Sequence, residues 1–344
     1  MKKLLIASTA LALTAGAAAA EVKFSGDARF GLQYNSNADV RDSNFFNTAN
    51  ASKTRLEKRM SINIDGSTTA DNGVTFGGRI RLRSEELSAN AGGLGGRTMA
   101  AGARVFARAG GLTVAAGNIE GAIEVMPGVY APSVGLTGLS WGGMVTNVDT
   151  GGGFGGGASR YFDWDAYSSG GGGAEGIEAI YVMGDFRGHI SYSADNLRGT
   201  AGDAKTIAAF GAYTFSGWTV ALGIQDTNGA AGDAGRDKII LTAAGRVGDF
   251  GIGFGAASNG KGVAKVNKFA VNGSYTMGAT TISGYVANQS VLPGAMAANT
   301  KGTSKTSYGI GAAYNMGGGA RIVGGIERTT QKTTRADVGV AFAF

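Results

Sequence analysis

Apolar and polar residues alternate along most of this chain, and this period of two constrains the fold more than any other feature. Residues 22–30 read VKFSGDARF and residues 74–83 read VTFGGRIRLR. Successive side chains of a β-strand point to opposite faces, so each such stretch predicts a strand with one apolar and one polar face. The pattern therefore indicates an all-β protein rather than a helical one.

Sixteen alternating segments follow one another. They cover residues 21–34, 52–65, 73–84, 102–109, 112–117, 176–183, 186–193, 206–215, 218–226, 237–247, 250–258, 266–276, 279–287, 306–315, 320–329 and 333–344. Most of the connections alternate between tight turns and longer loops, and this layout is typical of a transmembrane barrel. We therefore predict a 16-stranded antiparallel transmembrane β-barrel over residues 21–344. The 112–117 segment is short for a spanning strand, so we expect it to extend at its end.

The composition fits a barrel in a membrane. There is no cysteine, which excludes disulfides and thiolate metal sites. The mean hydropathy is near zero, as expected where half of each strand faces water. Glycine is the outlier, with 62 of 344 residues, well above the average of about 7%.

The first 20 residues have the features of a signal peptide. Lys2 and Lys3 precede a short apolar run, and Ala18 to Ala20 form a small-residue cleavage site. We expect residues 1–20 to be removed when the chain is exported.

The polar face of the first strands is rich in arginine. By parity, eight arginines face the interior of the predicted barrel: Arg29, Arg55, Arg59, Arg79, Arg81, Arg83, Arg104 and Arg108. Arginine keeps its charge in such a setting, so these side chains repel one another.

The connection 118–175 is much longer than an ordinary loop, is acidic, and contains many apolar residues. We expect this third loop to fold into the barrel and to narrow it. Its candidate constriction acids are Glu120, Glu124, Asp149, Asp163 and Asp165. An acidic loop opposite a basic wall would create a field across the pore, and such constrictions set ion selectivity. The alternative is that the arginines only solvate the wall or pair locally, as Arg55 and Glu57 could.

The chain resembles the alphaproteobacterial general diffusion porins. The resemblance rests on the mature start EVKFSGDARFG (residues 21–31), the arginine-rich second and third strands, the long third loop and the terminal Phe344. It implies a homotrimer of sixteen-stranded barrels in the outer membrane of a Gram-negative bacterium, with the third loop folded inward opposite the arginines. Lipid and lipopolysaccharide would surround the barrels, and small hydrophilic solutes would cross them. Phe344 would be the assembly signal for the barrel-assembly machinery.

Weaker signals are present as well. Asp163 and Asp165 could share a structural Ca²⁺ ion, and we expect no other metal and no cofactor. His189, with Ser191 and Ser193 on the same strand face, shows no complete catalytic pattern, so we do not expect an enzyme. The charge balance of +6 forms no basic patch for nucleic acid once it is divided between arginines and acidic loops.

Two rival functions stay open. A substrate-specific channel, for example for sugars, would use an aromatic track, for which Trp141, Tyr161 and Trp164 are the candidates. A structural or adhesive barrel would not conduct and would need a plugged interior.

Overall fold

The computed structural model describes residues 20–36, 52–85, 97–149, 175–194, 205–228, 237–262, 265–291 and 304–344. Within these ranges seventeen strand segments form one sheet. They are β1 (Glu21–Asn35), β2 (Thr54–Thr69), β3 (Thr75–Glu85), β4 (Arg97–Ala100), β5 (Arg104–Ala109), β6 (Leu112–Gly117), β7 (Glu175–Met183), β8 (Phe186–Ala194), β9 (Lys205–Phe215), β10 (Trp218–Asn228), β11 (Lys238–Val247), β12 (Phe250–Asn259), β13 (Val266–Met277), β14 (Thr280–Gln289), β15 (Thr306–Gly317), β16 (Ala320–Arg328) and β17 (Thr334–Ala343).

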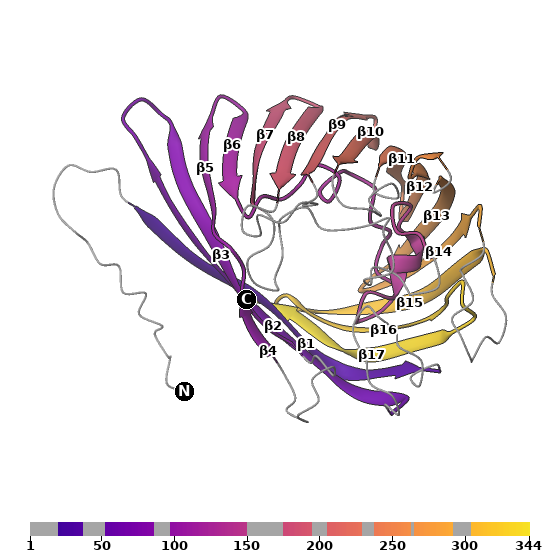
Figure 1. Ribbon diagram of the computed structural model, residues 1–344. Coiled ribbons are helices and arrows are strands. Elements are labelled where there is room, and N and C mark those ends of the chain that lie inside the picture. The colour runs from indigo at the N-terminus through magenta and orange to yellow at the C-terminus, as the bar shows by residue number, and fades with distance from the viewer. Residues whose placement is uncertain are drawn as a thin grey trace, which may run out of the picture.

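The sheet closes into a barrel (Figure 1). β1 pairs with β17 from Asp27 opposite Ala343 to Asn35 opposite Arg335. β4 and β5 both pair with β3, so they form one interrupted strand and the barrel has sixteen antiparallel strands, as predicted. Closure pairs the two edge strands with each other, so no long strand edge is left open.

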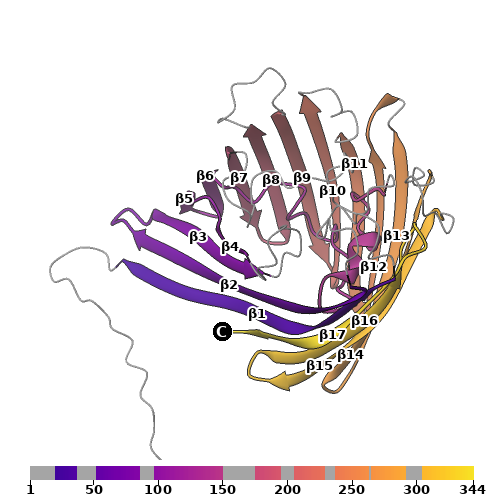
Figure 2. The same ribbon diagram turned by 60° about the horizontal axis from the view of Figure 1, so that its bottom comes forward.

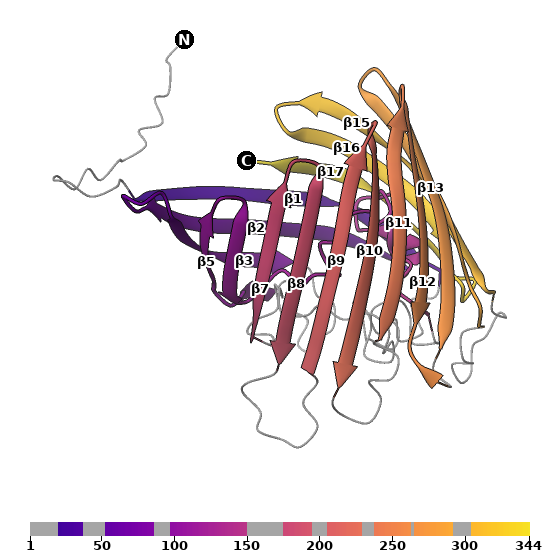
Figure 3. The ribbon, with the colours of Figure 1, turned by 90° about the horizontal axis from the view of Figure 1, so that it is seen from above.

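Tight turns join the strands at one end of the barrel, and longer connections join them at the other (Figure 3). Gly110 and Gly111 have φ values of 53° and 84°, and Ser216 and Gly217 have values of 48° and 79°. Two positive φ angles in a two-residue turn match the twist of a hairpin. The Phe344 amide donates to the Gly26 carbonyl at 3.0 Å, so the C-terminus lies at the end with the tight turns.

The outer face of the barrel exposes apolar side chains. Examples are Phe24 (67% exposed), Leu56 (75%) and Ile190 (61%). An outward apolar band on a closed barrel is what lipid contact requires. In the described ranges no helix is both long and apolar enough to span a bilayer.

Strand β4 and the β-bulge between β4 and β5 were not predicted, because the alternating segments 73–84 and 102–109 left residues 85–101 as a connection. Leu82 pairs with Ala100, whereas Arg79 pairs with Arg104, so the partner strand has one additional residue. A bulge shifts the parity of the side chains that follow it. A search for strict alternation therefore cannot follow β4 and β5 as one continuous strand. The expected extension of the 112–117 segment was also wrong, since β6 ends at Gly117, where φ is 95°.

Candidate functional site

All eight predicted arginines lie on the inner face of β1 to β5, and we call this set the arginine wall. Two pairs stand directly opposite each other on neighbouring strands: Arg29 faces Arg59, and Arg79 faces Arg104. Like charges in this position destabilise a sheet. The wall therefore needs nearby groups that offset the repulsion.

Four of the arginines pair with carboxylates that belong to the barrel wall itself. The N–O distances are 2.6 Å for Arg29–Glu57, 3.0 Å for Arg59–Asp27, 2.6 Å for Arg79–Asp65 and 2.6 Å for Arg104–Glu178. Local pairing was the alternative considered for the arginines, and these four arginines do pair locally. Glu57, which was suggested for Arg55, pairs with Arg29. The first three of these acids share the parity of the arginines, so the alternation could have revealed them.

The remaining members show how the wall is spread along the lumen. Arg81 and Arg83 donate through Nε to Asn63 (3.0 Å) and Ser61 (3.3 Å) on β2. Arg55 lies near the loop end of the barrel, opposite Gln33. Arg108 lies one residue before the β5–β6 turn, at the other end.

The position of Phe106 shows that, after the bulge, Arg104 and Arg108 of β5 point into the barrel. Its ring centroid lies 5.7 Å from the Arg104 guanidinium and 5.3 Å from the Arg108 guanidinium. The cation–π contacts place all three side chains on the same face. A bulky apolar residue on a polar face was the observation that made the parity of these two arginines hardest to assign from sequence.

The first part of the connection after β6 folds into the barrel (Figures 1 and 2), and we call residues 118–149 the inner loop. Its short 3₁₀ helix η1 (Leu139–Gly143) lies beside β14 and β15. The apolar residues of the inner loop are buried against the inner faces of β9 to β14. The buried cluster comprises Ala122, Ile123, Met126, Val129, Val134, Leu139, Met144 and Val145 of the loop with Ala208, Phe210, Ala212, Ala221, Ile240, Ala257, Ala270, Tyr285 and Ala287 of the wall.

Small wall residues let the inner loop lie close to the strands. Gly311 and Gly325 are paired on β15 and β16, and a Cβ atom on either would overlap the Val134 carbonyl. A Cβ on Gly255 would lie 2.9 Å from a Val145 methyl group. Part of the glycine excess therefore forms a seat for the loop.

Polar contacts fix the inner loop at several points. Asp337 on β17 accepts hydrogen bonds from the Leu136 amide (2.8 Å) and the Thr137 amide (2.7 Å). Arg29 donates to the Leu136 carbonyl at 3.0 Å, which ties the arginine wall to the loop. Lys268, fully buried on β13, donates to the Asn147 carbonyl at 2.5 Å.

The expected place of Asp149 in the constriction needs correction. Its side chain is buried and accepts hydrogen bonds from Thr330 and from Gln331 (3.0 Å), near the loop end of the barrel. Its backbone also bonds the side chain of Gln289. Asp149 thus anchors the far end of the inner loop and does not face the arginine wall. The sequence could not show this, because it does not reveal the path that the loop takes through the barrel.

Glu120 and Glu124 lie in the inner loop and are partly buried. The Glu120 amide donates to Glu178, the partner of Arg104, at 3.0 Å, so the loop starts beside the arginine wall. Asp163 and Asp165, with the proposed calcium site, lie outside the described residues. In the described part of the chain no group of three or more His, Asp or Glu residues could hold a metal ion.

His189 and Ser191 also contact the start of the inner loop or its partners. His189 Nε2 lies 3.0 Å from Glu178 Oε2, and Ser191 Oγ accepts a hydrogen bond from the Ala122 amide at 2.8 Å. These contacts give both residues a part in holding the loop.

A family model described as Gram-negative porin matches residues 7–334 of the chain. The chain belongs to the Gram-negative porin family. Such porins are β-barrel channels of the outer membrane. Porins from Fuscovulum blasticum (27% identical over 329 residues) and Rhodobacter capsulatus (29% over 350 residues) are similar, with 94% of this chain and 100% of each relative covered.

The porin fold is also found among solved structures. A triple mutant of the Rhodopseudomonas blastica porin matches with a TM-score of 0.73 at 24% identity, covering 94% of this chain and 100% of that one. A second mutant of the same porin matches with a TM-score of 0.72 at 26% identity and the same coverage.

The lumen of this porin stays open beside the inner loop. A cavity of about 820 Å³ is lined by wall residues, including Asp27, Arg29 and Arg59, and by Leu136 of the loop. Two arginines of the wall, the carboxylate of Asp27 and residues of the inner loop therefore line the same open space.

Proposed function

We propose that this protein is a general diffusion porin that forms a water-filled channel for ions and small hydrophilic solutes. The inner loop occupies one side of the barrel interior, and the arginine wall lines the other. This arrangement is the observation that carries the proposal, because charged groups lining a constriction act on every solute that passes.

The paired carboxylates hold the guanidiniums without removing their charge from the pore. Arg59 and Arg79 keep 24% and 39% of their side chains exposed. Ion pairs in contact with water add only about 0–1 kcal/mol to stability. We therefore assign the wall to the electric field of the lumen rather than to the stability of the barrel.

We also propose that the mature chain, without the signal peptide 1–20, forms a homotrimer in the outer membrane. β6 has six residues, whereas a strand needs about 9–11 to cross the hydrocarbon. A barrel wall that is too short to cross the hydrocarbon must be shielded from lipid, and a neighbouring subunit would shield it. Membership of the porin family supports self-association but does not identify the residues of the subunit interface.

Planar-bilayer recording of the purified protein tests the proposal. We expect large, ohmic conductance steps that appear in groups of three. Block of these steps by one sugar would favour a substrate-specific channel, and their absence would favour a structural barrel.

Three aromatic residues were the candidates for a sugar track in such a channel. Trp141 packs against the apolar cluster of loop and wall, and Tyr161 and Trp164 lie outside the described residues.

A further inference from the structure

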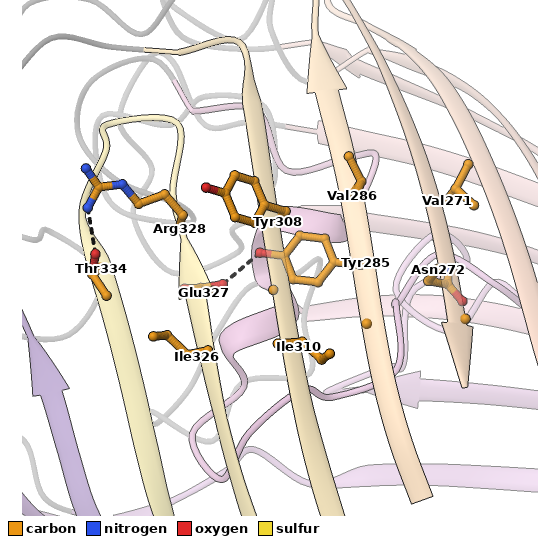
Figure 4. A pocket seen from close by; sticks show the side chains of 13 residues that line it. Val271, Asn272, Tyr285, Val286, Tyr308, Ile310, Ile326, Glu327, Arg328 and Thr334 are labelled. Carbon is orange, nitrogen blue, oxygen red and sulfur yellow. Dashed lines mark hydrogen bonds between the residues drawn. The ribbon is translucent and has the colours of Figure 1, made fainter. Parts of the chain in front are cut away.

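An apolar groove runs along the outside of the barrel over β13 to β17 (Figure 4). Its floor is made by Gly273 and Gly284, which pair directly on β13 and β14. Both belong to the outward set of their strands, so their missing side chains leave a depression in the lipid-facing surface. Large apolar side chains border it: Val271, Val286, Ile310 and Ile326. The cavity of about 680 Å³ is within the range of about 300–1,000 Å³ found for ligand sites.

A cation stands at the loop end of this groove. Arg328 is the last residue of β16 and shares the outward parity of Ile326. Its Nη1 donates to Thr334 Oγ1 at 2.6 Å, and in the described part of the chain it makes no ion pair. An outward arginine costs about 2–4 kcal/mol at the bilayer midplane and about 0–1 near its surface, so its place at the strand end suits the headgroup region.

Neighbouring groups extend the polar end of the site. Tyr308 pairs with Arg328 and is 53% exposed on the same face, where a phenol fits the membrane interface. Lys332 in the β16–β17 turn and Lys305 just before β15 are exposed on the same rim. The groove is therefore apolar along its length and basic at the end with the long connections.

We propose that this groove binds a phosphorylated glycolipid of the outer leaflet, namely the lipid A part of lipopolysaccharide. One acyl chain lies over Gly273 and Gly284, and a phosphate accepts hydrogen bonds from the Arg328 guanidinium. The fork of donors on arginine matches phosphate oxygens. The long-loop end of such a barrel faces the outside of the cell, which selects an outer-leaflet lipid. The inference rests on the proposed outer-membrane location.

Native mass spectrometry of the full-length mature protein, titrated with purified lipid A, tests the site. We expect Arg328→Gln and Gly273→Leu each to lower lipid A affinity about tenfold, or about 1.4 kcal/mol. Leu suits the second variant because a Cβ on Gly273 would have its nearest neighbour at 3.7 Å. The matched controls are Lys261→Gln, in the β12–β13 connection and outside the groove lining, and Gly66→Leu, where a Cβ meets nothing within 4 Å.

The outcomes separate the possible occupants. Unchanged lipid A binding in both variants would overturn the proposal. Equal binding of phosphatidylglycerol to the wild type would also overturn the proposal, because a groove that binds this anionic lipid equally well does not select lipid A. Loss of trimer in Gly273→Leu with lipid binding intact would show a subunit contact instead. Conductance is recorded on the same samples, so a barrel that fails to conduct but still binds lipid A refutes the proposed function alone.

Discussion

Replacing Arg79, Arg81 and Arg83 together with serine should shift the ion preference of the channel strongly toward cations. These residues lie at successive inward positions of β3, and their loss leaves Asp65 without the partner that it has at 2.6 Å. The lumen thus loses three positive charges and gains the full effect of one negative charge. The measurement is the reversal potential in a salt gradient across a planar bilayer.

The salt dependence makes this test specific. The Debye length is about 10 Å at 0.1 M salt and about 3 Å at 1 M, so the shift should be large in dilute salt and small in concentrated salt. Lys261, Lys305 and Lys332 replaced together with serine form the control, because the charge change is equal but lies on external loops. A triple-arginine variant with the wild-type reversal potential at low salt would remove the arginine wall from ion selection.

Alanine at Gly325 or Gly311 should displace the inner loop from its seat. Neither glycine has a positive φ, so alanine fits the backbone, and the conflict is with the Val134 carbonyl. Overpacking of this kind costs about 1–3 kcal/mol. We expect a lower free energy of unfolding in urea and noisier, larger open-channel currents.

The double variant sharpens this prediction. Both new methyl groups would meet the same carbonyl, so once one has moved the loop, the second should cost little, and the two effects should fall short of additivity. Gly66→Ala is the control, because its Cβ would meet nothing within 4 Å. Fully additive losses with normal channel currents would show that the loop does not rest on these glycines.

Much of the fold follows from the sequence because strand parity is a local property. The alternation from Val22 to Phe30 identifies both faces of β1 and places Arg29 inside. The tight turns are equally local, since Gly110 and Gly111 carry the backbone angles that a hairpin needs. The apolar residues of the 118–175 connection also predicted that this loop folds into the barrel, and the family resemblance implied the same path.

What the sequence could not supply depends on register and on contacts between distant segments. The ion pair of Arg29 with Glu57 requires the alignment of β1 with β2, which no single segment contains. The bulge before Arg104 appears only when β4 and β5 are aligned with β3. Asp149 was assigned to the pore from its charge, although its contacts lie 181 residues away at Thr330.

A disulfide between the inner loop and the wall tests the central claim most directly. The chain has no cysteine, so any bridge comes from the introduced pair. A Cβ on Gly142 would lie 3.2 Å from the Ser307 Cβ, close to the separation of about 3.5–4.5 Å in a disulfide. A Tyr285→Phe background removes the hydroxyl that would lie 2.6 Å from the new Cβ.

The measurement is the extent of cross-linking between Gly142→Cys and Ser307→Cys in the folded, membrane-inserted protein, read by mass spectrometry with and without reductant. The control pairs Gly142→Cys with Tyr308→Cys, the next residue on the outer face. A loop seated inside the barrel predicts a nearly complete bridge in the first pair, none in the control, and a cross-linked channel that still conducts. A folded, conducting barrel in which the first pair stays reduced would contradict an inner loop lying against β15.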